Sequence, residues 1–509
     1  MWIATADRSK RVDERAEREF GLSAVVLMER AGMAVFDAVQ EILPGTGRIT
    51  VFCGKGKNGG DGFVVARLAL ERGYHIECLV AGEERDLCPE AAEQYRIAKL
   101  RGLEPIFFSD ARWARKADCV GCRDLIVDAL LGTGASHEVR GPVKTAIEAI
   151  NESGVPVVSV DVPSGILCDT GEELGESVWA LRTITFGMPK PFLFQGIGLE
   201  HSGYWSVADI GYPNVLLNEP TDARLVDRES VASLLPERLR ASHKGENGHL
   251  LIVAGSQRFR GAASLSALGA LHSGSGLVTV AGTREVCSAV ASQIPEAILH
   301  PLSEENGVLC PEAYQEILNL QSRCHAAVFG PGLTHDDAVL ELLSRVWEHW
   351  TKPAVIDADA LNALSHGVRL PNCPAILTPH PGEMSRLMQC STAEVQADRF
   401  QTVVQATESY RRTVLLKGPY SIVGDPNQPL MVNQTGNPGQ ASGGMGDVLA
   451  GVLGALLAQQ LPTYHAACCG MFWHGLSADI CAEEIGPIGY TATDVAKALP
   501  KARARIVAS

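Results

Sequence analysis

The residues best suited to chemistry in this 509-residue chain lie in a glycine-rich run, 439–451, which reads GQASGGMGDVLAG. The run places Asp447 at the front of an apolar segment, 448–461, that has the composition of a buried helix. One interpretation is a helix cap, since an Asp at a helix start accepts hydrogen bonds from backbone amides. The other is phosphoryl transfer: the amides of residues 443–446 would hold a phosphate, and Asp447 would take a proton from the acceptor hydroxyl.

Three glycine-containing segments in the first half carry carboxylate, amide or hydroxyl oxygens that could bind a ligand. They are 54–62 (GKGKNGGDG, with Asn58 and Asp61), 128–134 (DALLGTG, with Asp128) and 160–165 (VDVPSG, with Asp161 and Ser164). Glycine allows a close approach of the main chain, and a helix start favours anions. Oxygen donors without a His or Cys set suit an alkali or alkaline-earth cation better than zinc. The structural alternatives are a tight strand-to-helix turn for 54–62 and a simple cap for each Asp.

The elements that must position these residues are short apolar runs that end at glycine and alternate with helical patterns. This alternation predicts parallel strands covered by helices, that is, an α/β fold. Because ligands bind at the carboxyl ends of parallel strands, the glycine-containing segments are expected to meet at one edge of a sheet. The expected strands are 48–54, 75–82, 125–134 and 155–165 in the first half, and 249–256, 275–282, 326–332, 353–361, 374–383 and 413–418 in the second.

A polar, proline-punctuated stretch separates the two series of strands. We therefore predict a first domain at 1–215, a linker at 216–230 and a second domain at 231–509. The length fits two or three domains.

The composition excludes several classes of protein. A net charge of −15 argues against a nucleic-acid partner, and 46% hydrophobic residues argue against disorder. The charged N-terminus lacks the apolar region of a signal peptide, and no apolar run reaches the roughly 20 residues of a membrane span. The fourteen cysteines are scattered; Cys119 and Cys122 form a lone C-x-x-C, which favours reduced thiols and a cytoplasmic location.

Five motifs in the first half together resemble the NAD(P)H-hydrate epimerase domain: the three segments above, MERAG (28–32) and TFGMPKP (185–191). The resemblance covers about residues 1–215 and implies a Rossmann-like three-layer α/β/α fold that interconverts the R and S forms of hydrated NADH and NADPH. It implies K⁺ ligands at Asn58, Asp128 and Ser164, and a substrate-binding acid and proton shuttle at Asp161. Further substrate contacts would be Asn58, Gly59, Gly60, Asp61, Gly132, Thr133 and Gly134. Lys57 departs from the family, where a second asparagine is usual.

The second half resembles ADP- or ATP-dependent NAD(P)H-hydrate dehydratase, of the ribokinase-like superfamily, over roughly 230–505. The motifs are HKG (243–245), GPGL (330–333), DADAL (357–361), TPHPGE (378–383), KG (417–418) and 436–451. The resemblance implies that Asp447 deprotonates the hydrate hydroxyl, which then receives the terminal phosphate of ADP or ATP with the help of Mg²⁺. Gly332 and His380 would bind the hydrate, and Lys417, Gly418, Pro419, Tyr420, Ser421 and Gly446 the nucleotide. Gln440 departs from the usual methionine.

Taken together, the two resemblances imply a bifunctional enzyme, an isomerase fused to a lyase, that repairs damaged NADH and NADPH. The family also implies a homo-oligomer. Two alternatives stay open from the residues. The second half could be a small-molecule kinase of ribokinase type that releases a stable phosphorylated product. The first half could be a binding or scaffold module without activity.

Overall fold

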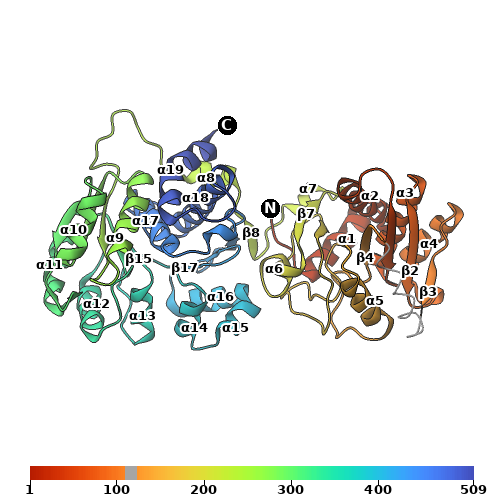
Figure 1. Cartoon of the computed structure of the whole chain (residues 1–509), viewed down its shortest axis with the longest axis horizontal. Helices are drawn as coiled ribbons and strands as arrows, with labels where there is room; N and C mark the ends of the chain where they lie inside the picture. The colour runs from red at the N-terminus through yellow and green to blue at the C-terminus, as the bar shows by residue number, and fades with distance from the viewer. Residues whose placement is uncertain (109–122, 509) are drawn as a thin grey trace. The chain divides into compact units, whose positions relative to one another are not determined.

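The computed structural model describes residues 1–108 and 123–508, and it divides into two compact units, Met1–Ala223 and Arg224–Ser509 (Figure 1). The division falls inside the segment 216–230, for which we predicted a linker. That segment is not free of secondary structure, however, because strand β8 (Ala223–Leu225) and the start of helix α8 (Arg228–Leu234) lie in it. Asp227 caps α8 by accepting a hydrogen bond from the amide of Ser230. Cys119 and Cys122 lie outside the described residues.

The first unit is built on a seven-stranded sheet in which every pair of neighbouring strands is parallel. The strand order is β3-β2-β1-β4-β5-β6-β7, so it reverses between β1 and β4. Ligands in such sheets bind at the carboxyl ends of the strands that flank the reversal. The strands are β1 Arg48–Cys53, β2 His75–Ala81, β3 Ile106–Phe108, β4 Leu125–Ala129, β5 Val157–Val160, β6 Arg182–Phe186 and β7 Tyr204–Ala208.

Helices cover both faces of this sheet, which makes the first unit a three-layer α/β/α domain. Alternate strand residues face opposite layers: Val51 and Cys53 pack with α2, α3 and α4, whereas Phe52 packs with α5. The helices are α1 Ala6–Phe20, α2 Ala24–Ile42, α3 Lys57–Glu71, α4 Pro89–Leu100, α5 Gly141–Glu152, α6 Gly198–His201 and α7 Asn214–Leu217, with short 3-10 turns at η1 Glu84–Asp86 and η3 Pro191–Phe194.

Gly32 explains why the motif MERAG ends in glycine. A Cβ atom at Gly32, on α2, would lie 2.4 Å from the side chain of Val64 on α3. The two helices therefore pack more closely than any larger residue would allow. This contact fixes α3, whose first turns carry Asn58 and Asp61.

The second unit contains a ten-stranded sheet of order β11-β10-β9-β14-β15-β16-β17-β18-β19-β8, and a separate two-stranded ribbon β12-β13. The pairings from β11 to β17 are parallel, whereas β17-β18 and β18-β19 are antiparallel. Their connections are too short to hold a crossover helix. Bounds not yet given are β9 His249–Val253, β10 Leu277–Gly282, β11 Ile298–Pro301, β12 Glu304–Glu305, β13 Val308–Leu309, β14 Ala326–Phe329, β15 Ala354–Ile356, β16 Ala375–Leu377, β17 Thr413–Leu416, β18 Ile422–Gly424 and β19 Leu430–Val432.

Helix α17 (Met445–Ala458) forms the centre of the second unit and is buried along nearly its whole length. It packs against α9, and glycines make the crossing close: a Cβ atom at Gly451 would lie 2.0 Å from the carbonyl oxygen of Ser266. The other helices are α9 Arg260–His272, α10 Arg284–Gln293, α11 Tyr314–Gln321, α12 Asp337–His349, α13 Asp359–Ser365, α14 Pro381–Met388, α15 Thr392–Ala397, α16 Arg399–Tyr410, α18 Thr463–Glu484 and α19 Ala492–Val507, with 3-10 turns at η4 Pro311–Ala313 and η5 Pro438–Gln440.

The helical structure extends further toward the N-terminus at both glycine-rich runs than the apolar patterns suggested. Helix α3 begins at Lys57, inside the run 54–62, and α17 begins at Met445 rather than at 448. The cap of α17 is Gly444, at φ 89° and without a side-chain hydrogen bond. The interpretation of Asp447 as the helix cap is therefore wrong, because Asp447 lies inside the first turn. Within the described residues, no helix has the length and apolar character needed to cross a membrane.

Candidate active sites

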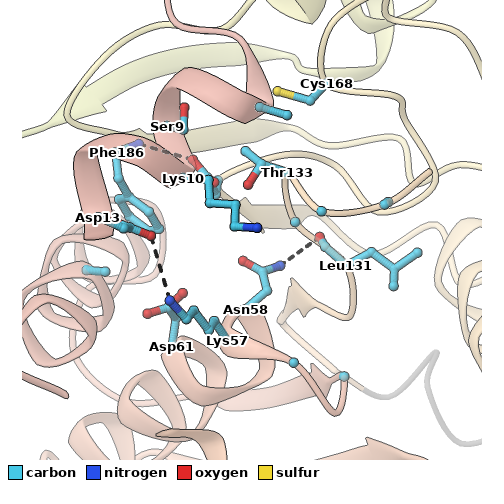
Figure 2. Close-up of a pocket in the computed structure, with 18 of the residues that line it drawn as sticks. Ser9, Lys10, Asp13, Lys57, Asn58, Asp61, Leu131, Thr133, Cys168 and Phe186 are labelled. Atoms are coloured by element: carbon cyan, nitrogen blue, oxygen red, sulfur yellow. Dashed lines mark hydrogen bonds and ion pairs between the residues drawn. The ribbon is translucent and has the colours of Figure 1, made fainter. Parts of the chain in front are cut away.

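The first unit contains a cavity of about 1120 Å³ at the carboxyl ends of β1, β4, β5 and β6 (Figure 2). All three predicted glycine-containing segments contribute to its lining, as does helix α1. The predicted substrate contacts that line it are Asn58, Asp61, Gly132, Thr133, Gly134 and Asp161. The expectation that these strand ends converge is thus met in the structure.

Asn58, Asp128 and Ser164, the residues for which a K⁺ ion was expected, lie around the backbone of Leu131. The amide Nδ2 of Asn58 donates to the carbonyl oxygen of Leu131 at 2.7 Å, a contact visible in Figure 2. The backbone N–H of Leu131 donates to Oγ of Ser164 at 2.8 Å. These contacts bring the side-chain oxygens of Asn58 and Ser164 to the same loop. Amide and hydroxyl oxygens are suitable ligands for an alkali cation.

Asp128 is fully buried and already has hydrogen-bond donors on both carboxylate oxygens. Ser164 donates its hydroxyl to Oδ1 at 2.5 Å and its backbone N–H to Oδ2 at 2.9 Å, and Ser159 donates its hydroxyl to Oδ2 at 2.9 Å. Leu130 adds a longer backbone bond of 3.3 Å to Oδ1. A carboxylate offers about four acceptor positions, so Asp128 as arranged here fixes Ser164 rather than presenting a free oxygen.

Asp161 forms an ion pair with a buried lysine. Its Oδ1 accepts hydrogen bonds from Nζ of Lys190 at 2.6 Å, from the hydroxyl of Thr185 at 2.9 Å and from the backbone N–H of Phe186 at 3.2 Å. Lys190 is 2% exposed. Asp161 also has φ 63°, a left-handed conformation that is unfavourable outside glycine and that clusters at functional sites. The motif TFGMPKP contributed Lys190, but we had predicted no role for this lysine.

Helix α1 adds a further carboxylate, Asp13, that sequence reasoning missed. The hydroxyl of Tyr212 donates to Asp13, and Nζ of Lys57 lies 3.9 Å from the other oxygen of Asp13 (Figure 2). Burial, the largest influence, raises the pKa of Asp13. The Lys57–Asp13 pair is partly exposed, so it contributes little stability. Lys57, which stands where the family usually has an asparagine, thus places a positive charge beside Asp13 at the cavity. Asp13 and Tyr212 are far apart in sequence, and no local motif marks them.

A second cavity, of about 670 Å³, lies in the second unit and contains Gly332, Asp359 and Asp447. Burial raises the pKa of Asp447 to about 7, with smaller contributions from the charges of Asp357 and Asp359 and against the opposing charge of Lys417. A carboxylate with a pKa near neutrality is suited to accept a proton at physiological pH. Asp447 therefore has the position and the basicity of a general base.

Lys417 lies in a buried network beside the start of α17. Its Nζ is 2.8 Å from Oδ1 of Asp357 and 3.6 Å from Oε2 of Glu383. A Cβ atom at Gly446 would lie 3.4 Å from the same nitrogen, so these two predicted nucleotide contacts adjoin each other. Burial opposes the charge on Lys417, but the two carboxylates outweigh it and raise its pKa. Neither Asp357 nor Glu383 had a predicted role.

The loop 417–421 is fixed by Arg399, a fully buried arginine on α16. Its guanidinium donates to the backbone carbonyl oxygens of Pro419 and Tyr420. Burial lowers the pKa of Arg399 to about 10. Nothing in the local sequence pattern indicated this arginine, since burial of a charged residue depends on tertiary packing.

His380 is the N-cap of α14 and does not belong to the cavity lining that contains Gly332 and Asp447. Its Nδ1 accepts hydrogen bonds from the backbone of Gly382 at 3.0 Å and of Glu383 at 3.3 Å. The carboxylate of Glu383 accepts in return from the backbone N–H of His380 at 2.8 Å, which completes a capping box. The prolines on either side hold this turn, as the sequence suggested. His380 thus positions Glu383 beside Lys417.

Gln440, the second departure from the family pattern, makes hydrogen bonds that methionine could not make. Its Nε2 lies 3.2 Å from Nδ1 of His474, which is buried on α18, and its Oε1 accepts from the backbone of Asn437 at 3.3 Å. Burial lowers the pKa of His474 to about 4, so the ring is neutral. Gln440 therefore ties the glycine-rich loop to α18.

Comparison with known proteins agrees with this geometry. A family model described as NAD(P)H-hydrate dehydratase matches residues 250–501, and one described as YjeF-related protein N-terminus matches residues 24–192. The bifunctional NAD(P)H-hydrate repair enzyme Nnr of Coxiella burnetii is 39% identical over 97% of this chain and 98% of its own length. The chain belongs to the bifunctional NAD(P)H-hydrate repair enzyme family. The resemblance of both halves is thereby confirmed.

Other members of the family and a solved structure support the same assignment. The repair enzyme of Escherichia coli is 36% identical over 98% of this chain and 93% of its own length. The Bacillus subtilis ADP/ATP-dependent NAD(P)H-hydrate dehydratase, crystallised with ATP and Mg²⁺, has a TM-score of 0.50 and 28% identity, and covers 55% of this chain and 98% of its own. A ribokinase-like protein of Enterococcus faecalis has the same TM-score at 23% identity, which supports the fold of the second unit. The α/β, ribokinase-like fold class is confirmed.

Proposed function

We propose that this chain repairs NADH and NADPH whose nicotinamide ring has been hydrated. The first unit interconverts the R and S hydrates, and the second dehydrates the S form to NAD(P)H with ADP as phosphoryl donor, releasing AMP and phosphate. The observation that carries the proposal is Asp447, whose pKa is raised to about 7 in a cavity beside Lys417 and Gly446. Family membership of the whole chain favours this function over a small-molecule kinase of ribokinase type.

The chemistry of the dehydration follows from the hydrate itself. The reduced nicotinamide ring is an enamine, so water adds to the ring carbon next to nitrogen. Asp447 removes the proton of that hydroxyl, and the oxygen attacks the terminal phosphorus of ADP, from which AMP leaves. The C–O bond of the phosphate ester then breaks with its electron pair on oxygen, assisted by the nitrogen lone pair. Loss of a proton from the neighbouring ring carbon to the departing phosphate restores the double bond.

The remaining groups of the second site hold charge and position the reactants. The amides at 443–446 and Nζ of Lys417 would stabilise the charge that develops on the transferred phosphate. Gly332 lines the cavity and would bind the hydrate. Asp357 and Glu383 supply the hard oxygen donors that suit Mg²⁺, which would neutralise phosphate charge when bound. The loop 417–421, fixed by Arg399, would contact the nucleotide.

In the first unit, Asp161 is the proton-transferring carboxylate, and Lys190 positions it through an ion pair. The start of α3, where Asn58 lines the cavity, together with the loop 132–134, would hold the phosphates of the dinucleotide. Asn58 and Ser164 offer oxygens that fit K⁺, with Asp128 fixing Ser164 behind them. Such an ion would supply a fixed positive charge at the phosphate side of the cavity.

The test is recovery of NADPH from a mixture of both hydrate epimers, followed by its near-ultraviolet absorbance. With ADP or ATP and Mg²⁺, we expect recovery from both epimers. Recovery from only one would contradict the epimerase assignment and reopen the scaffold alternative. A stable phosphorylated product without NADPH would contradict the dehydratase assignment. We also propose a cytoplasmic homo-oligomer, for which size-exclusion chromatography with light scattering measures the assembly.

A further inference from the structure

Asp61 has an unusual environment on the wall of the first cavity. It lies in the first turns of α3, is 8% exposed and belongs to the cavity lining (Figure 2). Among the residues that the structure describes, none donates a hydrogen bond to its carboxyl group or forms an ion pair with it. Asp128 and Asp161, the other carboxylates at these strand ends, have four and three donors respectively.

Burying a carboxyl group that has no hydrogen-bond partner lowers the stability of the folded protein. A neutral side chain of similar shape would avoid this loss. Burying an unpaired polar group is unfavourable, and an ionised one would be more unfavourable still. Burial raises the pKa of Asp61 well above its ordinary value; the charges of Asp161 and Asp13 raise it further, and Lys57 opposes them. These influences favour the neutral carboxylic acid, whose O–H group would be available to a ligand in the cavity.

Asp61 and Asp161 thus form a pair of acids with opposite environments. Asp161 accepts hydrogen bonds from Lys190, Thr185 and Phe186, whereas Asp61 has no donor among the described residues, and burial and the neighbouring negative charges raise its pKa. Such pairs, in which the surroundings separate the two protonation states, are how one site supplies both an acid and a base.

We propose that Asp61 is the general acid of the epimerisation and that Asp161 is its base. This inference rests on the proposed epimerase function of the first unit. Asp61 transfers its proton to the hydroxyl oxygen of the hydrate, and the C–O bond breaks with its electron pair on the departing water. The ring nitrogen lone pair forms a C=N bond in the resulting iminium ion. Water then forms a C–O bond on the opposite face, and Asp161 takes the surplus proton.

The site returns to its starting state when the proton passes from Asp161 to Asp61. The net reaction exchanges one water for another and inverts one carbon, so no oxidant or further reactant is needed. Other titratable groups near Asp61 are Asp13 and Tyr212, which are bonded to each other, Lys57 on the same helix, Lys190 beside Asp161 and the buried thiol of Cys53 on β1. None of them makes a hydrogen bond to Asp61 within the described ranges.

The test uses the full-length chain, because its second unit reports on the first. With ADP, Mg²⁺ and both hydrate epimers, the wild-type chain restores NADPH in a fast phase from the S form and a slower phase set by epimerisation. Asp61→Asn should slow the second phase by about 100-fold or more, the usual effect of losing an acid–base group, and leave the first phase unchanged. The matched control is Asp86→Asn, on η1, which removes an exposed carboxylate at the edge of the same cavity and should change neither phase.

The pH dependence separates a catalytic from a structural role. Because the acid must be protonated, kcat/KM for the second phase should fall as pH rises through the raised pKa of Asp61. In Asp61→Asn this alkaline decline should disappear, and the folded chain should be at least as stable as wild type, increasingly so at higher pH. In Asp61→Glu, which keeps the acid, part of the second phase and its alkaline decline should return.

Three outcomes distinguish failure of the inference from failure of the proposed function. If the wild-type chain shows no second phase above the rate without protein, the epimerase function itself is wrong. If that phase is present and Asp61→Asn keeps it within about threefold, Asp61 is not the acid. If Asp61→Asn loses the first phase as well, the fold has changed, and Asp61→Glu decides: a second phase without an alkaline decline overturns the inference.

Discussion

Replacing Asp447 with asparagine should abolish dehydration and at the same time stabilise the second unit. The loss of activity follows from loss of the base, which is typically a factor of about 10²–10⁴. The gain in stability follows from burial. A pKa that rises from 3.8 to about 7 on folding corresponds to at most about 4 kcal/mol of lost stability once the group is ionised in the folded state. Asparagine keeps the shape of the side chain without the charge.

The sign and the pH window follow from the raised pKa. The folded state binds the proton more tightly than the unfolded state, so stability from this group decreases as pH rises from about 4 through 7 and is lowest above 7. At pH 8 we expect the unfolding transition of the second unit in Asp447→Asn to lie several degrees above that of wild type, at roughly 2–4 °C per kcal/mol. Near pH 4 the two proteins should unfold at nearly the same temperature.

Two measurements on the same preparation of Asp447→Asn check the predicted loss of activity and gain of stability. They are turnover of the S hydrate, and calorimetry at pH 4 and pH 8. Binding of nucleotide should be retained, because Lys417 and the glycine amides are unchanged, and isothermal titration would measure it. An inactive variant that is also less stable at pH 8 would mean that activity was lost through damage to the fold. Normal turnover would refute the assignment of Asp447 as the base.

Three other predictions concern the same machinery. With nucleotide saturating, kcat/KM for the S hydrate should rise about tenfold from pH 6 to pH 8, because Asp447 must lose its proton near pH 7 to act as base; a flat profile would contradict this. Lys190→Met should leave the half-buried Asp161 without its ion-pair partner, lowering stability by about 3 kcal/mol in denaturant titrations and slowing the epimerisation phase; unchanged stability would show that this ion pair is not coupled to the fold. Gly32→Ala should lower the free energy of unfolding by about 1–3 kcal/mol, since its Cβ atom would overlap Val64, and an equally stable variant would mean that the two helices move apart freely.

The local pattern of the sequence predicted much of the fold, because strands and helices follow from the spacing of apolar residues and from glycine at their ends. Alternating apolar runs identified two α/β domains, and the glycine-containing segments at strand ends identified where ligands bind. Segments 54–62, 128–134 and 160–165 do meet at one cavity. Parallel strands bring their carboxyl ends to the same edge whatever the details of packing, so this convergence was available from sequence.

Only the tertiary structure decided which side chains pair and which are left alone in the interior. Lys190 pairs with Asp161, Arg399 fixes the loop 417–421, and Asp61 is buried with no hydrogen-bond donor among the residues that the structure describes; all three depend on tertiary packing. The basicity of Asp447 also depends on the tertiary structure. Asp447 resembled a helix cap in sequence, and burial beside Asp357 and Asp359 is what raises its pKa to about 7. Residue type and spacing determined where the reactive groups lie along the chain, whereas desolvation and long-range contacts determined their charge.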